Sequence, residues 1–337
     1  MKLNLVLLSA LAVLAPAASA GEFRFRFLGS VSTASNPNGA YAGVMAGDAA
    51  ELVCEVETVT PPPVVVAPGQ YVNYAVNTAT MTLRLGSIVV PYTSGAPVVG
   101  MVNAFPVSDG VQGPAASMGS KNLAYSINHN SGLWVSTDPA QNVGTHPIVV
   151  DSSFSFTFQV TGGGTFLEIF PSSIVVERVE VGTGFCFGDG SGTACPCANS
   201  SPTGTGVGCL NSLGTGGKLR VYGLASLAGD TLQLAGSQMP ISSALYFQGT
   251  TQQSGGLGVA FGDGLRCASG TIIRLGTKSN VSGASQYPAA GDPSVSVRGL
   301  VTSPGTREYQ CWYRNAAAFC TASTFNLTNG VSISWTM

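Results

Sequence analysis

The chain has 337 residues, of which only 9% are charged, and its formal net charge is −2. Its hydrophobic content of 45% is enough for a packed core, which excludes the usual composition of a disordered chain. A nearly neutral, slightly acidic surface argues against nucleic acid or an anionic membrane as partner, because both select clusters of Lys and Arg.

The first 20 residues have the three parts of a secretory signal peptide. A Met-Lys start precedes a short apolar run over 3–14, and a small-residue cleavage site follows at 18–20. The apolar run is shorter than the roughly 20 residues that a membrane-spanning helix needs. We therefore expect cleavage after Ala20, no membrane span in the mature chain, and a secreted or cell-surface location.

Strand patterns recur along the rest of the chain, and convincing helix patterns do not. Residues 23–27 alternate Phe with Arg, which is the period of a strand with one buried face. Similar alternation occurs at 52–56, 81–85, 154–160, 232–234, 245–247, 295–297, 309–313 and 331–335. Turn-forming Gly and Pro clusters separate these runs, as in β-sandwiches. The sequence predicts an all-β protein, with one helical turn allowed at 315–319.

A change in cysteine density divides the mature chain. Residues 21–183 contain one cysteine, Cys54, and the other seven follow the Gly-rich joint at 182–184. We expect two β-sandwich-like modules, 21–183 and 184–337, of which the second is stapled by disulfides.

Eight cysteines in an exported chain predict disulfide bonds. The candidates are Cys54, Cys186, Cys195, Cys197, Cys209, Cys267, Cys311 and Cys320. Cys195 and Cys197 are too close to pair with each other, so we expect them to bond outward, to Cys186 and Cys209. Cys311 and Cys320 are expected to close a short loop, and Cys54 pairs across the joint, stays free or links two chains. Zinc held by Cys186, Cys195, Cys197 and Cys209 is the alternative, but their spacing fits zinc knuckles poorly.

Common catalytic motifs are absent from the sequence. The two histidines, His129 and His146, lie in loop-like polar stretches, and neither His-Glu-x-x-His nor Gly-x-Ser-x-Gly occurs. Glu55 and Glu57 share a strand face and are the carboxylates that an extracellular hydrolase would use. Charges on an exposed strand face more often serve solubility and edge protection, so we expect no enzyme and no cofactor.

The sequence Phe-Gly-Asp-Gly occurs twice, at 187–190 and at 261–264. Asp-Gly predicts a turn, because Gly accepts a positive φ. A calcium site using Asp189, Ser191 and Asp263 is the alternative, although the alternating acids of an EF-hand loop are missing.

Two tryptophans, Trp134 and Trp312, are the candidates for ligand binding. Trp312 alternates away from the face of Tyr309 and lies between polar neighbours, while Trp134 lies in a loop-like stretch. An exposed Trp beside polar groups suits carbohydrate, and burial in a core is the alternative. The partner favoured by this interpretation is a cell-surface or extracellular polysaccharide.

Four blocks of the second half resemble a known module. They are FCFGDGSGTACPCAN at 185–199, YFQGT at 246–250, FGDGLRC at 261–267 and YQCWYR at 309–314. In this order they resemble a Cys-rich C-terminal module of exported proteins from planctomycete-type bacteria, over about 184–337. The resemblance implies an accessory role in export, attachment or stability, and it carries no known activity.

The first half resembles the β-sandwich region of exosortase-sorted, PEP-CTERM-type exported proteins, through residues 27–31, 46–48, 68–71 and 83–87. No Pro-Glu-Pro signal, apolar span or basic tail follows Trp335, so anchoring by that route is not expected. The leading prediction is a non-catalytic secreted or cell-surface protein with a structural, attachment or binding role. Carbohydrate binding is the alternative, and an extracellular hydrolase is less favoured.

Overall fold

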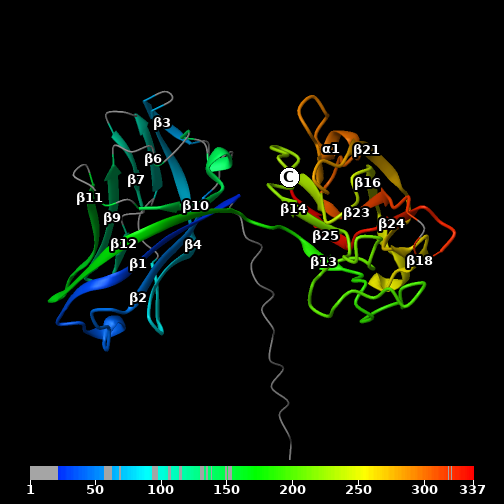
Figure 1. Ribbon diagram of the computed structural model, residues 1–337. Coiled ribbons are helices and arrows are strands. Elements are labelled where there is room, and N and C mark those ends of the chain that lie inside the picture. Colours follow the sequence, from blue (N-terminus) through cyan, green and yellow to red (C-terminus); the bar gives the residue numbers. More distant parts are fainter. Residues whose placement is uncertain are drawn as a thin grey trace, which may run out of the picture.

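The computed structural model describes residues 22–56, 63–67, 70–92, 98–104, 108–113, 116–129, 133, 136–137, 139–148, 150, 154–317, 319 and 321–337. The predicted signal peptide, Glu57, Trp134 and Cys320 lie outside these residues, and so does the side chain of His129. The prediction of an all-β protein is confirmed, and the strands form two separate groups of sheets (Figure 1).

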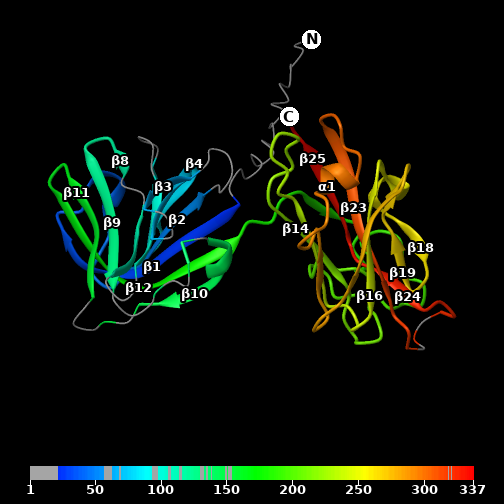
Figure 2. The ribbon, with the colours of Figure 1, turned by 90° about the horizontal axis from the view of Figure 1, so that it is seen from above.

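The first group of strands closes on itself. It consists of β1 (Phe23–Ser35), β2 (Ala49–Val56), β3 (Val64–Ala67), β4 (Tyr71–Leu85), β5 (Ile88–Pro91), β6 (Val98–Ala104), β7 (Ser108–Gln112), β8 (Ala116–Met118), β9 (Lys121–His129), β10 (Gly144–Pro147), β11 (Ser155–Gly162) and β12 (Thr165–Arg178), with the 3-10 helices η1 (Gly39–Tyr41) and η2 (Pro139–Asn142). Antiparallel pairing runs β1-β2-β4-β6-β7-β9-β11-β12 and returns to β1 through the β1–β12 pairing. The long strands therefore form a ring of eight, seen from a second direction in Figure 2.

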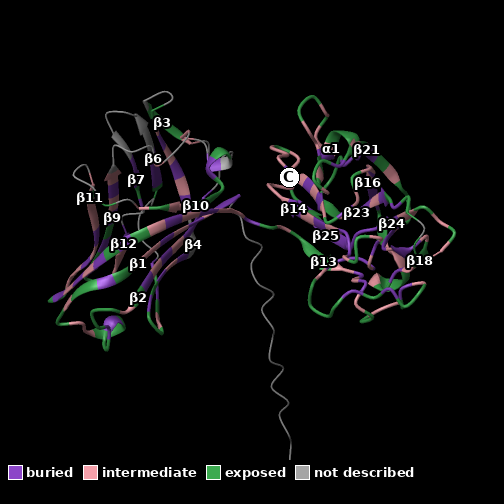
Figure 3. Cartoon of the chain, viewed as in Figure 1, coloured by how far each residue is buried: buried purple, intermediate pink, exposed green. Residues whose placement is uncertain are grey.

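Side-chain alternation along the strands fills the interior of this ring. Phe25 and Phe27 are fully buried, whereas Arg24 and Arg26, at the alternate positions of the strand, point outward. On β2 the alternate residues 52, 54 and 56 are also fully buried. Figure 3 shows the resulting change between buried and less buried residues along β1 and β12.

The second group of strands forms a sandwich around its own core. It consists of β13 (Thr183–Phe185), β14 (Lys218–Tyr222), β15 (Gln233–Ser237), β16 (Ser243–Gly249), β17 (Thr251–Gln252), β18 (Val259–Phe261), β19 (Gly264–Arg266), β20 (Ala268–Ser269), β21 (Ile273–Ser279), β22 (Ser285–Tyr287), β23 (Gly305–Arg314), β24 (Phe325–Leu327) and β25 (Gly330–Trp335), with η3 (Gln253–Gly256) and the short helix α1 (Val295–Arg298). A sheet in the order β13-β25-β23-β16-β21, with β24 beside β23, faces the three-stranded sheet β14-β15-β22. Buried tyrosines 246, 309 and 313 fill much of the space between them.

The chain passes between the two groups through a joint that contacts both of them. Val179 N donates to Glu22 O at 3.0 Å, and two residues later Val181 N donates to Val221 O at 2.8 Å. The Arg178 guanidinium lies 5.9 Å from the ring centroid of Tyr222, in the second group of strands. The predicted boundary between residues 183 and 184 falls inside β13, which pairs with β25.

Two local predictions of secondary structure are wrong. Val295 and Val297 were expected in a strand, but they form α1, where the Asp230 carboxylate accepts a hydrogen bond from Ser296 N at 2.6 Å. This contact with the N-terminal turn comes from 66 residues away, so local alternation could not indicate it. Conversely, 315–317 are not helical, because the fully buried Asn315 side chain is held by Ser212 and Asp263.

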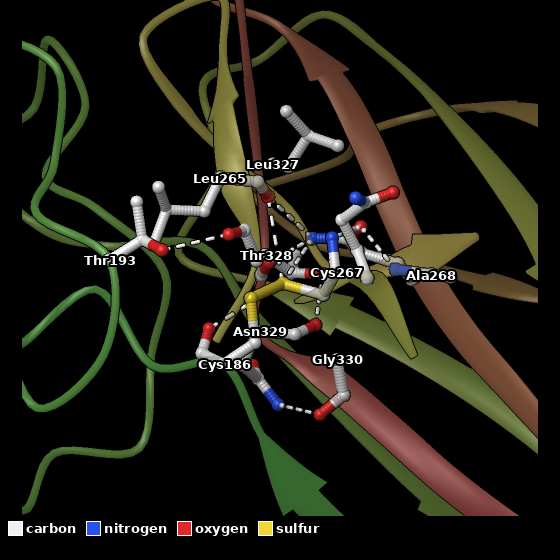
Figure 4. The surroundings of a disulfide bond; sticks show 12 residues. Cys186, Thr193, Leu265, Cys267, Ala268, Leu327, Thr328, Asn329 and Gly330 are labelled. Carbon is white, nitrogen blue, oxygen red and sulfur yellow. Dashed lines mark hydrogen bonds between the residues drawn. A yellow bond between two sulfur atoms is a disulfide. The ribbon is translucent and has the colours of Figure 1, made fainter. Parts of the chain in front are cut away.

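The disulfides differ from the expected pattern. Cys195 bonds to Cys209, one of the two outward partners expected for Cys195 and Cys197, but Cys186 bonds to Cys267, which is 81 residues away (Figure 4). Cys197 is also disulfide-bonded, so the zinc alternative is wrong for this set of cysteines. The segment after β13 packs on the β18–β19 hairpin as well as on itself, which brings Cys186 to Cys267 beside Leu265.

Among the described cysteines, two that were disulfide candidates are free, so the expected loop closed by Cys311 and Cys320 is wrong. Cys54 points into the ring of strands, whose sequence contains no second cysteine, and Cys311 points into the core of the sandwich beside Met239. Burial raises the pKa of both thiols, so the reactive thiolate is disfavoured at neutral pH.

A buried carboxyl on β23 makes stability depend on pH. Glu308 is 5% exposed, and burial raises its pKa above the usual value even though Ser332 Oγ donates to it at 3.2 Å. The buried, protonated Glu308 carboxyl therefore contributes to the stability of the folded state below its unfolded pKa of about 4.3. That contribution is lost as the pH rises through the higher pKa of Glu308 in the folded state. Glu308→Gln should flatten the decline of Tm with rising pH that the Glu308 carboxyl causes, as measured by thermal unfolding over a pH series.

Ser332→Ala removes a hydrogen bond that favours the charged form of Glu308, so the decline of Tm should extend to higher pH. A Tm–pH profile that is unchanged in both variants would contradict the assignment of this pH dependence to Glu308.

Candidate functional site

Three aromatic side chains gather on the outer face of the sandwich. Trp312 alternates with the fully buried Cys311 and Tyr313 on β23, so its half-buried ring lies on the opposite face, as predicted. Its centroid is 5.4 Å from Phe325 on β24, and Phe325 is 5.0 Å from Phe261 on β18. We call Phe261, Trp312 and Phe325 the aromatic cluster.

Arg266 borders the aromatic cluster and adds a polar group to it. Its guanidinium lies 5.8 Å from the Phe261 centroid, and its Nη2 donates to Gln253 Oε1 at 3.2 Å. Phe261 itself is 42% exposed. Trp312 and Phe325 are partly buried and pack against Phe247, Ala268 and Leu327. Partly exposed aromatic rings beside a guanidinium can contact both the apolar faces and the hydroxyl groups of a ligand.

The second Phe-Gly-Asp-Gly sequence explains how Phe261 is positioned. Phe261 pairs with Gly264, so Gly262 and Asp263 are the turn of the β18–β19 hairpin, as the sequence predicted. Gly262 has a φ of +63°, and a Cβ there would lie 2.3 Å from the ring of Phe325. Glycine is therefore required both by the backbone and by the close approach of this ring.

Asp263 fastens the hairpin to the rest of the sandwich. Its fully buried carboxylate accepts hydrogen bonds from Thr321 N and Thr321 Oγ1, both at 2.8 Å, and from Asn315 Nδ2 at 3.2 Å. Its backbone N–H donates to Phe325 O at 3.0 Å, and its carbonyl accepts from Asn199. This network determines where the aromatic cluster lies.

The three residues of the calcium alternative do not share a site. Asp189 Oδ1 accepts from Ser191 N at 3.0 Å and from Ser191 Oγ at 2.5 Å, which closes an exposed turn. These hydrogen bonds lower the pKa of Asp189. Asp263 is anchored separately, as described above. Among the described residues, no group of three or more His, Cys, Asp or Glu side chains could hold a metal ion.

Charged side chains also gather on the outer face of the ring. This charged ladder consists of Arg24, Arg26, Glu51, Glu55, Arg84 and Glu177, and it lines a shallow depression of about 500 Å³. Arg24 Nη2 is 2.7 Å from Glu55 Oε1, and Arg26 Nε is 2.5 Å from Glu51 Oε1. Glu55, a candidate of the hydrolase alternative, is thus buried beside a guanidinium; its predicted partner Glu57 lies outside the described residues.

The histidines lie in strands and not in loops, so that prediction is wrong. His129 is the last residue of β9, and His146 belongs to β10, where it pairs with Ile174. The polar residues around His129 and His146 lie at the end of β9 and in the short strand β10. Polar residues are common in such positions, so their presence does not distinguish a strand end from a loop. His146 Nε2 lies 2.7 Å from Asn142 O, so this ring nitrogen is engaged by the backbone.

Comparison with known proteins found no matching family model, curated protein or solved structure. No helix in the described part of the chain is long and apolar enough to cross a membrane. The resemblances of the two halves to exported proteins therefore stay predictions.

Proposed function

We propose that this chain is a non-catalytic secreted or cell-surface protein that acts in attachment or binding. The observation that carries the proposal is the aromatic cluster on the outer face of the sandwich. Glu55 and Asp263 are the buried carboxylates that would be the first candidates for catalysis. Glu55 is paired with Arg24, and Asp263 accepts hydrogen bonds from Thr321, so both hold the fold together. The disulfides support an oxidising compartment, as the leader-like sequence at 1–20 does.

A second candidate function, polysaccharide binding, is favoured by the composition of the aromatic cluster. Trp312 and Phe325 offer apolar ring surface, and Arg266 offers hydrogen-bond donors beside it. Sugar rings have apolar C–H faces and polar hydroxyl edges, and this pairing suits them. Trp134 lies outside the described residues and adds nothing to this proposal.

Trp312→Ala tests the binding candidate. We expect wild-type protein to bind at least one polysaccharide on an array that includes cellulose, chitin, dextran and alginate. The Trp312→Ala variant should bind it about tenfold more weakly, because an aromatic contact is worth roughly 0.5–1.5 kcal/mol beyond area burial. Affinity is measured by titration with soluble oligosaccharides of the same polymer.

Phe170→Ala is the matched control, because Phe170 is a 39% exposed aromatic residue on β12, far from the cluster in the sequence. It should bind like wild type. If no polysaccharide binds the wild-type protein, the binding candidate is wrong and only the attachment role remains. A loss shared equally by both variants would contradict a role specific to Trp312.

A further inference from the structure

A second concave surface lies beside the joint between the two groups of strands. We call it the junction groove: a depression of about 300 Å³ lined by Arg220, Tyr222, Ala235, Gly236, Ser237, Ala284, Ser285 and Gln286. It crosses the outer face of the sheet β14-β15-β22. Its residues are separate from those of the aromatic cluster.

Strand register explains why this face is hollow. Ala235 on the middle strand pairs with Arg220 on one side and with Gln286 on the other. One row further along, Tyr222 pairs with Gln233. A methyl group thus lies between long polar side chains and a tyrosine, and the central position forms the floor of the groove.

The aromatic wall of the groove is held in place from the other side of the joint. The Arg178 guanidinium lies 5.9 Å from the Tyr222 centroid and also hydrogen-bonds to Gln233. Glu180 forms a β-bridge with Tyr222, and its carboxylate Oε1 is 2.9 Å from Arg220 Nε. Side chains that are already ordered lose less conformational entropy when a ligand binds.

The charge around the groove favours an anionic ligand. Residues 184–337 carry eight Lys or Arg and five Asp or Glu, a net charge of +3, whereas residues 21–183 carry five and eleven, a net charge of −6. Arg220 is the charged residue that lines the groove, and its Nε is 2.9 Å from Glu180 Oε1. Lys218 on the same face of β14 and Arg178 against Tyr222 are positively charged neighbours of the groove. These side chains and the net positive charge of the second half favour an acidic ligand on this side of the joint.

We propose that the junction groove binds a saccharide that carries a carboxylate, such as a uronate unit of an acidic polysaccharide. Tyr222 stacks against a sugar ring, Arg220 meets the carboxylate, and Gln286 and Ser237 bond to hydroxyl groups. Guanidinium and carboxylate match in geometry and charge, which gives selectivity over neutral sugars. The proposal deepens the polysaccharide-binding candidate above, because it names a ligand class and a second set of residues.

The test uses the full-length mature chain and oligogalacturonate, with cello-oligosaccharide of the same length as the neutral probe. We expect oligogalacturonate to bind more tightly, and to bind more weakly as salt rises from 50 to 500 mM, because salt screens charge pairs. Tyr222→Ala and Arg220→Gln should each raise its Kd about tenfold. Phe170→Ala should leave this Kd unchanged, and equal Tm values show that the variants are folded.

The outcomes separate this proposal from the one on which it rests. If Tyr222→Ala binds oligogalacturonate like wild type, or if Trp312→Ala alone abolishes binding, the groove is not the site, although polysaccharide binding stands. Equal affinity for the neutral probe would overturn the ligand class. If the wild-type chain binds neither probe but binds another polysaccharide on the array, only the groove proposal fails. Binding to no polysaccharide at all would remove both.

Discussion

Replacing Cys186 and Cys267 together with alanine is expected to lower the free energy of unfolding by about 4.5 kcal/mol. The bond closes a loop across 81 residues, so its removal returns much conformational freedom to the unfolded chain. It also joins the segment after β13 to the strand end after β19, where few aliphatic side chains are available for packing. Chemical denaturation of the folded variant, followed by tryptophan fluorescence, measures the change.

The matched variant removes the bond between Cys195 and Cys209, whose sequence separation is 14. The same relation between loop length and entropy predicts a loss of about 3 kcal/mol for it. Cys54→Ala, which breaks no disulfide, shows what the loss of one buried thiol costs. The interpretation would be contradicted if the shorter loop proved the more stabilising one.

Asp263→Ala is expected to be strongly destabilising, at roughly 3 kcal/mol. The substitution leaves Thr321 N, Thr321 Oγ1 and Asn315 Nδ2 without their shared acceptor. Because these donors are buried or part-buried, water replaces the lost hydrogen bonds poorly. The same denaturation experiment gives the value, and the hairpin that carries Phe261 should become more susceptible to protease.

Asp189→Ala is the control that the chain itself provides, because Asp189 has the same position in the first Phe-Gly-Asp-Gly sequence. Its carboxylate is partly exposed and bonds mainly within its own turn, with a further backbone contact at Gly204, so we expect a change of about 0.5 kcal/mol or less. Similar losses in the two variants would mean that the tertiary contacts of Asp263 contribute little.

Much of the fold could be predicted because strand alternation is a local property. Phe23 to Phe27 and Tyr309 to Tyr313 show a buried face within five residues, and the structure buries that face in each case. The outward direction of Trp312 follows from the same rule. Where a tertiary contact competes with local pattern, as at α1 and its Asp230 partner, the prediction is wrong.

The candidate sites depend mostly on contacts between residues that are far apart in the sequence. Phe261 and Phe325 join Trp312 only because a hairpin folds over β24, and neither residue stands out in its own segment. Arg178 and Tyr222 meet across the joint, 44 positions apart, and the Cys186 partner is further still. The repeated Phe-Gly-Asp-Gly sequence was the one local indication of the aromatic cluster. It predicted a turn, but it did not show that the second turn positions Phe261 beside Phe325.

The closed ring has a consequence for the order of events during synthesis. Its last pairing, β1 with β12, needs the chain only as far as Arg178, and the next cysteine, Cys186, emerges eight residues later. The ring can therefore enclose Cys54 before any competing thiol of the same chain is made. Seven cysteines are then left to oxidise among themselves, and the buried Cys311 leaves that set when the sandwich closes around it.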